Sequence, residues 1–180
     1  MKRILATTLT LTLVMFIQAQ TTVTFMGVPV KGDYESFKQE LLKKGCYTDK
    51  NNLLKGVVDG ALSTIIIKED HNEVVSVTTI EIERLKNEND AVSRYNYLID
   101  YYRERPDYTE YESNPYINDT EQATIQKYIG SEWYYAEFFQ SIEPQRYTRR
   151  MGIKISGRKG DYRIVRLYDN NYDIDMKLPK

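Results

Sequence analysis

The residues that could do chemistry are few in this chain, and they lie far apart in the sequence. The only histidine, His71, lies between Asp70 and Asn72 in a predicted turn, and the only cysteine is Cys46. One histidine and one cysteine are too few ligands for a zinc site, and no nucleophile motif accompanies either residue. We therefore expect no metal, no cofactor and no catalytic residue among them. A solvated turn histidine and a small, buried, apolar cysteine are the expected roles.

An acidic pattern near the end of the chain is similar to a calcium-binding loop. Its oxygen-bearing side chains match ligand positions one, three, five and seven of such a loop, and they are Asp169, Asn171, Asp173 and Asp175. Ile174 stands where the loop needs a glycine, and Lys180 stands where it needs a glutamate that binds through both oxygens. We therefore interpret the segment as a polar tail and expect no metal there.

Glu110 and Glu112 form a second acidic pattern. They would share one face of a strand over residues 107–113, and many hydrolases use a pair of carboxylates as acid and base. Acidic residues are also common on exposed strands, so the pair alone does not predict an enzyme. A secreted hydrolase that uses carboxylates and tyrosines is kept as the alternative function.

The strand expected over residues 132–140 is strongly aromatic. Its side chains alternate between two faces, one with Trp133, Tyr135, Glu137 and Phe139 and the other with Tyr134, Ala136 and Phe138. The small Ala136 suits close packing of a helix, so the face with the tryptophan would be partly exposed unless a loop or a neighbouring subunit covers it. Two cations of the next strand should lie on that same face. The candidate binding residues are therefore Trp133, Tyr135, Phe139, Glu137, Arg150 and Lys154.

Helices that could position these residues are expected at three places. Asp33 can cap a helix that Gly45 ends. A second helix, capped by Asn87, is expected over residues 87–105, and a short third helix over residues 120–129. The apolar residues expected on the buried face of the first helix are Tyr34, Phe37 and Leu41.

Strands fill much of the remaining chain, and turns such as Asp59-Gly60 join consecutive strands into antiparallel meanders. The expected strands cover residues 53–58, 61–68, 74–83, 107–113, 132–140, 146–156 and 161–168. We therefore predict an α+β fold, in which a mostly antiparallel sheet carries about three helices on one face. A helix followed by three strands occurs over residues 33–83 and again over 120–168, which indicates two helix-plus-three-strand units.

Residues 1–20 are typical of a secretory signal peptide. Lys2 and Arg3 precede an apolar run, and Ala19 is a small residue near a plausible cleavage site. The run is short for a membrane-spanning helix and contains several threonines. We therefore expect an exported protein, periplasmic or extracellular, whose residues 21–180 form a single α+β domain without a transmembrane segment.

Composition narrows the kind of partner. The net charge is −1, so nucleic acid is not expected as a partner. One cysteine permits no internal disulfide, and packing alone must stabilise the fold. The chain is tyrosine-rich, with 16 tyrosines against 5 phenylalanines. Tyrosine packs a ring while its hydroxyl can stay in water, which suits the edge of a core or an exposed surface.

The start of the mature chain resembles a known group of proteins. The segment Phe25-Met26-Gly27-Val28-Pro29-Val30 and the pattern Phe37, Leu41, Lys44-Gly45-Cys46 resemble secreted, uncharacterised proteins of Bacteroides-type bacteria. Those proteins open with a Phe-x-Gly-Ile-Pro-like segment and a Phe-x-x-x-Leu-x-x-x-Gly helix. The resemblance implies an envelope or secreted location and an α+β fold, but no activity. The order of helix and meander also resembles the tandem layout of β-lactamase-inhibitor-like proteins, which implies an architecture only.

The combination of an expected signal peptide, few catalytic residues and an aromatic strand favours one function. We expect a non-catalytic extracytoplasmic binding or inhibitor-like module, whose aromatic sheet face contacts an unknown protein or glycan. A deep pocket with converging acids and raised carboxyl pKa values would instead favour the hydrolase.

Overall fold

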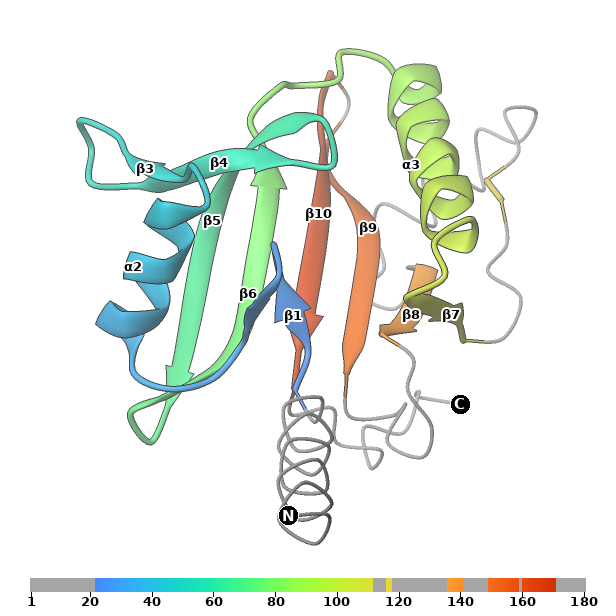
Figure 1. The fold of residues 1–180 in the computed structure, drawn as a ribbon. Coiled ribbons are helices and arrows are strands. Elements are labelled where there is room, and N and C mark those ends of the chain that lie inside the picture. Colours follow the sequence, from blue (N-terminus) through green and yellow to red (C-terminus); the bar gives the residue numbers. More distant parts are fainter. Residues whose placement is uncertain (1–21, 112–115, 118–135, 141–148, 159, 171–180) are drawn as a thin grey trace, which may run out of the picture.

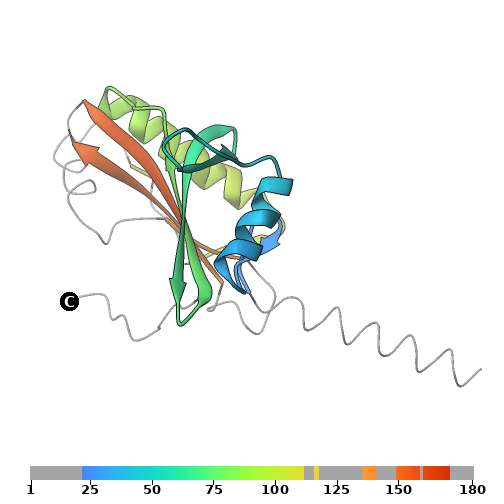
Figure 2. The same cartoon turned by 90° about the vertical axis from the view of Figure 1, so that its left-hand side faces the viewer.

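The computed structural model describes residues 22–111, 116–117, 136–140, 149–158 and 160–170. These residues form an eight-stranded antiparallel sheet, a separate two-stranded hairpin and two helices (Figure 1). Both helices lie on the same side of the sheet, as the views in Figures 1 and 2 show. The predicted α+β fold with a mostly antiparallel sheet is therefore confirmed. The helix expected over residues 120–129 lies outside the described residues, which contain two helices where about three were expected for the chain.

The elements follow one another in a simple order. They are β1 (Thr24–Phe25), β2 (Val28–Pro29), α2 (Tyr34–Lys43), β3 (Tyr47–Thr48), β4 (Leu54–Val58), β5 (Ala61–Asp70), β6 (Glu73–Glu81), α3 (Glu88–Arg103), β7 (Tyr108–Glu110), β8 (Ala136–Gln140), β9 (Arg150–Arg158) and β10 (Asp161–Asp169). Among the described helices, none has both the length and the apolar character needed to cross a membrane. The predicted signal peptide lies outside the described residues.

The sheet consists of two meanders joined at their last strands. Its strand order is β3-β4-β5-β6-β10-β9-β8-β7, and α2 precedes the first meander while α3 precedes the second. The predicted units of three strands are therefore wrong: within the described residues each unit has a helix and four strands, and the second unit begins at α3 rather than at residue 120. The sequence pattern missed β3, because its 2 residues are too few to show an alternation. β7 lies within the strand expected over residues 107–113, but the pattern did not show that this strand pairs with β8.

The helix boundaries follow from the capping residues. The Asp33 side chain accepts a hydrogen bond from the backbone N–H of Ser36 at 2.9 Å, and the Asn87 side chain accepts one from Asp90 at 2.8 Å. Gly45, just beyond α2, has a φ of 92°, which favours glycine. Both predicted caps and the predicted stop are confirmed.

The core lies between the helices and one face of the sheet, which we call the inner face. On α2, Phe37 and Leu41 are buried as expected, whereas Tyr34 is only half-buried. On the sheet, the inner positions of β9 are Met151, Ile153 and Ile155, all buried. This confirms the face predicted for that strand. The inner face is therefore closed by packed apolar side chains, except along the centre of the sheet, where polar groups replace them.

Candidate functional site

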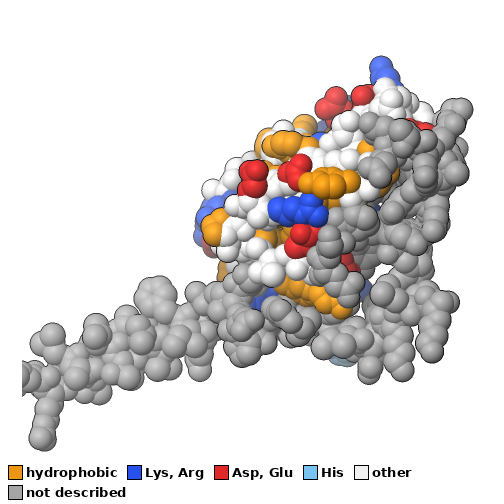
Figure 3. Space-filling view, turned by 90° about the vertical axis from the view of Figure 1, so that its right-hand side faces the viewer, with side chains coloured by type: hydrophobic (Ala, Val, Ile, Leu, Met, Phe, Trp, Pro, Cys, Tyr) orange, Lys and Arg blue, Asp and Glu red, His pale blue; other side chains and the backbone are white. Residues whose placement is uncertain are grey.

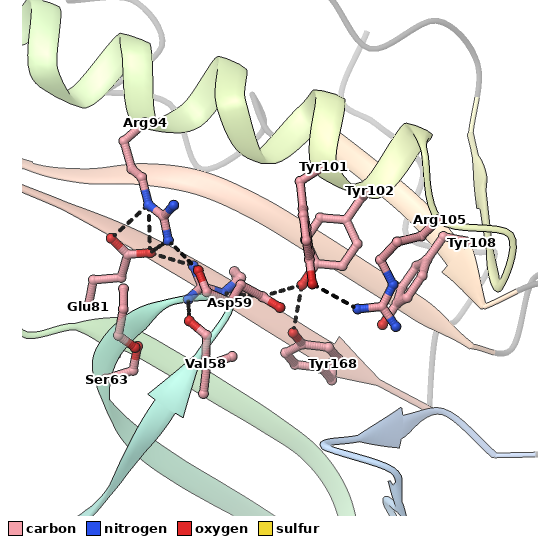
Figure 4. Close-up of polar contacts among 12 residues, drawn as sticks. Val58, Asp59, Ser63, Glu81, Arg94, Tyr101, Tyr102, Arg105, Tyr108 and Tyr168 are labelled. Atoms are coloured by element: carbon pink, nitrogen blue, oxygen red, sulfur yellow. Dashed lines mark hydrogen bonds and ion pairs between the residues drawn. The ribbon is translucent and has the colours of Figure 1, made fainter.

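A fully buried arginine lies at the centre of the sheet. Arg166 of β10 donates from Nη1 to Oε1 of Glu81 on β6 at 2.6 Å, and from Nη2 to the Val58 carbonyl at 2.9 Å. Arg94 of α3 donates to the same Glu81 oxygen at 2.8 Å, and to the Asp59 carbonyl at 2.9 Å (Figure 4). A buried charge is tolerated only with partners of opposite charge, and this cluster supplies them.

Asp59 connects the arginine cluster to two buried tyrosines. It lies in the tight turn between β4 and β5 with a φ of 49°, as the Asp59-Gly60 hairpin pattern predicts. Its Oδ2 lies 3.3 Å from Nε of Arg166 and accepts a hydrogen bond from the Tyr102 hydroxyl at 2.5 Å. The Tyr168 hydroxyl lies 3.0 Å from that of Tyr102. Because Tyr102 donates its proton to Asp59, Tyr168 is the donor in this second bond.

Burial determines the protonation state of these tyrosines. It is the largest cause that raises the pKa of Tyr102 well above its ordinary value, and the neighbouring Tyr168 and Asp59 add to it. Burial likewise raises the pKa of Tyr168, to which the charge of Asp59 also contributes. Both hydroxyls therefore keep their protons at neutral pH, and they form a directed chain of hydrogen bonds that ends at the carboxylate.

A cavity of about 230 Å³ opens beside this network. Among its lining residues, Gln140 of β8 has a positioning role. Its amide exchanges hydrogen bonds with the Thr24 backbone at 2.6 and 2.7 Å, and it donates to the Tyr108 hydroxyl at 2.8 Å. Gln140 thus fixes β1 against the second unit and orients Tyr108. Burial raises the pKa of Tyr108 to about 12, so this hydroxyl also stays protonated.

Arg105 stands at the edge of the cavity, just beyond the end of α3. Its guanidinium carbon lies 4.7 Å above the centre of the Tyr108 ring, a cation–π distance. Its Nε and Nη2 donate to the two oxygens of Asp107 at 3.0 and 2.6 Å. These bonds raise the pKa of Arg105 further and lower that of Asp107, so both groups are charged. Arg105 is therefore held in place over the ring of Tyr108.

The exposed side of α3 carries a cluster of aromatic and cationic side chains. The rings of Tyr97 and Tyr101 stack at 6.3 Å, Arg94 lies 5.2 Å over Tyr97, and Arg103 lies 4.8 Å over Tyr116. Tyr97 is 54% exposed and Tyr116 is 45% exposed. Figure 3, which shows the side of the molecule where α3 lies, has hydrophobic, basic and acidic side chains interspersed. We call Tyr97, Tyr101, Tyr116, Arg94 and Arg103 the α3 aromatic surface.

The predicted aromatic face of β8 is only partly described, because Trp133 and Tyr135 lie outside the described residues. Phe139 is 1% exposed, and its ring meets that of Tyr111 edge-on at 5.3 Å. An open aromatic face is therefore wrong for Phe139. Phe139 instead fits the alternative, in which this face of the sheet is covered.

Two of the three charged members of that predicted set form an ion pair. Arg150 and Glu137 form an ion pair at 2.6 Å, mostly shielded from solvent, which confirms that the next strand brings a cation to Glu137. Lys154 lies on the same face and is half-buried. Of the six candidate residues, the structure thus brings Glu137, Phe139 and Arg150 together on neighbouring strands, but in a shielded position.

The remaining sequence candidates have structural roles. His71 is 93% exposed in a turn and pairs with Asp70 at 3.0 Å, as expected. Cys46 is buried, and burial raises the pKa of its thiol, which confirms the apolar interpretation. Glu110 accepts two hydrogen bonds from Arg103, and Glu112 lies outside the described residues. In the part of the chain that the structure describes, no group of three or more His, Cys, Asp or Glu side chains could hold a metal.

Sequence reasoning missed the central network, although a signal for it was present. In β10, Arg166 takes an inner position between apolar residues of an alternating strand, and Glu81 takes a buried position at the end of β6. A charge in a core position of two strands indicates a buried pair. Asp59 was recognised only as a turn residue.

Comparison with known proteins finds no relative of this chain. No protein-family model matches the chain, and neither the curated proteins nor the solved structures include a significant match. The resemblance to secreted proteins of Bacteroides-type bacteria therefore stays a prediction.

Proposed function

We propose that the protein is a non-catalytic binding module that acts outside the cytoplasm and contacts a protein partner through the α3 aromatic surface. The observation that carries the proposal is the set of exposed tyrosine rings, Tyr97 and Tyr116, each held under a guanidinium group. Tyrosine and arginine are the residues that most often dominate binding energy at protein interfaces. Rings that are already fixed lose little conformational freedom on binding.

The charges of this surface are paired, which also suits a binding role. Arg103 donates to both oxygens of Glu110 at 2.9 and 2.8 Å, and Arg94 is engaged with Glu81. Both arginines are therefore held in place, while the rings of Tyr97 and Tyr116 remain exposed. A surface of ordered aromatic groups bordered by paired charges is typical of protein interfaces.

The hydrolase alternative has less support. Among the described residues that line the cavity, Asp59 is the only carboxylate, so converging acids are absent from this part of the lining. Hydrogen bonds to the charged form lower the pKa values of Asp33, Asp49 and Asp107. A general acid at neutral pH needs the opposite shift.

The proposed location and the inhibitor-like role rest on the sequence. A signal peptide over residues 1–20 would export the protein, and the tandem layout of helix and meander is consistent with an inhibitor-like module. These features support the proposal at the level of location and architecture.

Capture of a partner from envelope extract tests the proposal. The protein purified from its host is immobilised, and the captured proteins are compared with those held by Tyr97→Ala and Tyr116→Ala variants. Each substitution should weaken capture by about tenfold or more, with the thermal midpoint nearly unchanged, because an exposed ring contributes little to folding. Tyr47→Ala is the matched control, since Tyr47 is similarly exposed on β3 of the other unit. Equal capture by all variants would contradict the proposal.

A further inference from the structure

We infer that the cavity beside Asp59 binds a small zwitterion of the α-amino-acid class. The cavity offers a carboxylate, a tyrosine hydroxyl and a guanidinium group, each with hydrogen-bonding capacity that the described residues do not use. The inference is independent of the proposed function, because the cavity and the α3 aromatic surface have no residue in common.

Asp59 is the acceptor of the site. Its interactions with Tyr102 and with Arg166 both use the Oδ2 oxygen. Within the described part of the chain, Oδ1 is left to accept hydrogen bonds, and the residue lines the cavity. Figure 4 shows the carboxylate reaching from the turn toward Tyr102 and Tyr168. An ammonium group placed here would receive a charge-assisted hydrogen bond.

Tyr108 and Arg105 are the donors. The Tyr108 hydroxyl accepts from Gln140, so its own proton points elsewhere, and its raised pKa of about 12 keeps that proton in place. Arg105 uses Nε and Nη2 for Asp107, whereas Nη1 has only a long contact of 3.5 Å to the Tyr101 hydroxyl. A ligand carboxylate could therefore accept hydrogen bonds from Nη1 and from the tyrosine.

Charge balance favours a zwitterion over a simple ion. The buried cluster already pairs two arginines with Glu81 and Asp59, and Arg105 is paired with Asp107. A lone cation or anion would leave one uncompensated charge in a partly buried site, which is costly. A ligand with one positive and one negative charge leaves the net charge of the site unchanged. Its two charges also complement Asp59 inside the cavity and Arg105 at the edge.

The aromatic lining argues against a sugar. Sugars commonly stack on an open ring face, but the Tyr108 ring is covered by Arg105 at 4.7 Å. The rings of Phe25 and Tyr168, which also line the cavity, are buried and meet each other edge-on at 5.0 Å. The described rings around the cavity thus offer little surface for stacking.

The volume sets the size of the ligand. A cavity of about 230 Å³ has room for roughly eight water molecules at about 30 Å³ each. Sites for drug-sized ligands are larger, with volumes of roughly 300–1,000 Å³. A single amino acid with a short side chain fits this space, and a longer peptide does not.

Titration calorimetry of the protein purified from its host tests the inference, with glycine, L-alanine and L-serine as probes. Acetate, methylammonium and glucose serve as comparison compounds that carry only an anion, only a cation, or hydroxyl groups. We expect at least one amino acid to bind, and the comparison compounds to bind about tenfold more weakly or not at all.

Variants at the edge of the cavity make the test specific. Arg105→Gln and Tyr108→Phe should each weaken amino-acid binding by about tenfold, whereas Arg103→Gln, a neighbouring change outside the cavity, should not. Val57→Trp, at an exposed position in the lining, should block the site without disturbing the core. The inference is overturned if no amino acid binds, if glucose or acetate binds equally well, or if Arg105→Gln and Val57→Trp leave binding unchanged. Such a failure leaves partner capture intact, since capture depends on Tyr97 and Tyr116.

Discussion

Arg166 and Glu81 form an ion pair at 2.6 Å across the line where the two four-stranded units meet. The two residues come from the last strand of each unit and are 85 positions apart in the sequence. The backbone partner of Arg166 on β6 is Thr79, so Glu81 is its diagonal neighbour. Because a shift of one residue would turn Arg166 to the opposite face, the pair specifies the register in which the units join.

The first prediction concerns this pair. Arg166→Met should destabilise the protein by about 3–5 kcal/mol, because Glu81 and Asp59 lose a buried partner. Denaturant unfolding measures the change. The double variant Arg166→Met with Glu81→Met should recover part of the loss, because it removes the unpaired carboxylate of Glu81, while Asp59 and Arg94 still lack the partners that were removed. Arg163→Met is the control on the same strand, where the side chain is partly exposed. Equal losses from Arg163→Met and Arg166→Met would show that burial of the pair is not the cause.

The second prediction concerns the packing of α2. Phe37→Ala should cost about 3–5 kcal/mol, because Phe37 is buried in the core. Lys38→Ala, at a half-buried position of the same helix outside the core, should change stability by less than about 0.5 kcal/mol. Thermal or denaturant unfolding of both variants measures the two changes in stability. A large loss from Lys38→Ala, or none from Phe37→Ala, would contradict the packing of this helix.

Local features of the fold could be predicted from the sequence, because each depends on neighbouring residues only. The cap formed by Asp33, the stop at Gly45 and the turn at Asp59 each follow from one residue and its immediate neighbours. The inner face of β9 follows from its alternation. These signals require no knowledge of which strands pair.

Features that depend on pairing between distant segments could not be predicted. The second unit begins at α3 because β7, a strand of 3 residues, pairs with β8 across the intervening chain. The site is assembled in the same way: Asp59, Tyr102 and Tyr168 meet only when the β4–β5 turn, α3 and β10 come together. Each of the three residues is unremarkable in its own segment. A charged residue in an otherwise apolar inner row, as at Arg166, was the one available signal.

The last prediction concerns alkaline pH. Burial raises the pKa of Tyr108 from 10.0 to about 12, and it raises those of Tyr102 and Tyr168 as well. In the unfolded chain these tyrosines ionise near pH 10, so between pH 10 and 12 the unfolded state binds fewer protons than the folded state. The buried, protonated hydroxyls therefore make their full contribution to the free energy of unfolding below pH 10. This contribution is lost as the pH rises from 10 to 12.

The expected size of this loss follows from the shift. Two pKa units for Tyr108 alone correspond to about 3 kcal/mol by pH 12. Denaturant unfolding at pH 9, 10 and 11 measures the slope, and ultraviolet absorbance reports when phenolates form. Tyr108→Phe should reduce the slope, because one raised group is removed, whereas Tyr97→Phe, an exposed residue, should leave it unchanged. If ionisation of all tyrosines precedes unfolding, the three hydroxyls are not shielded as the structure requires. A slope that Tyr97→Phe reduces as much as Tyr108→Phe would likewise assign the effect to surface charge rather than to the buried tyrosine hydroxyls.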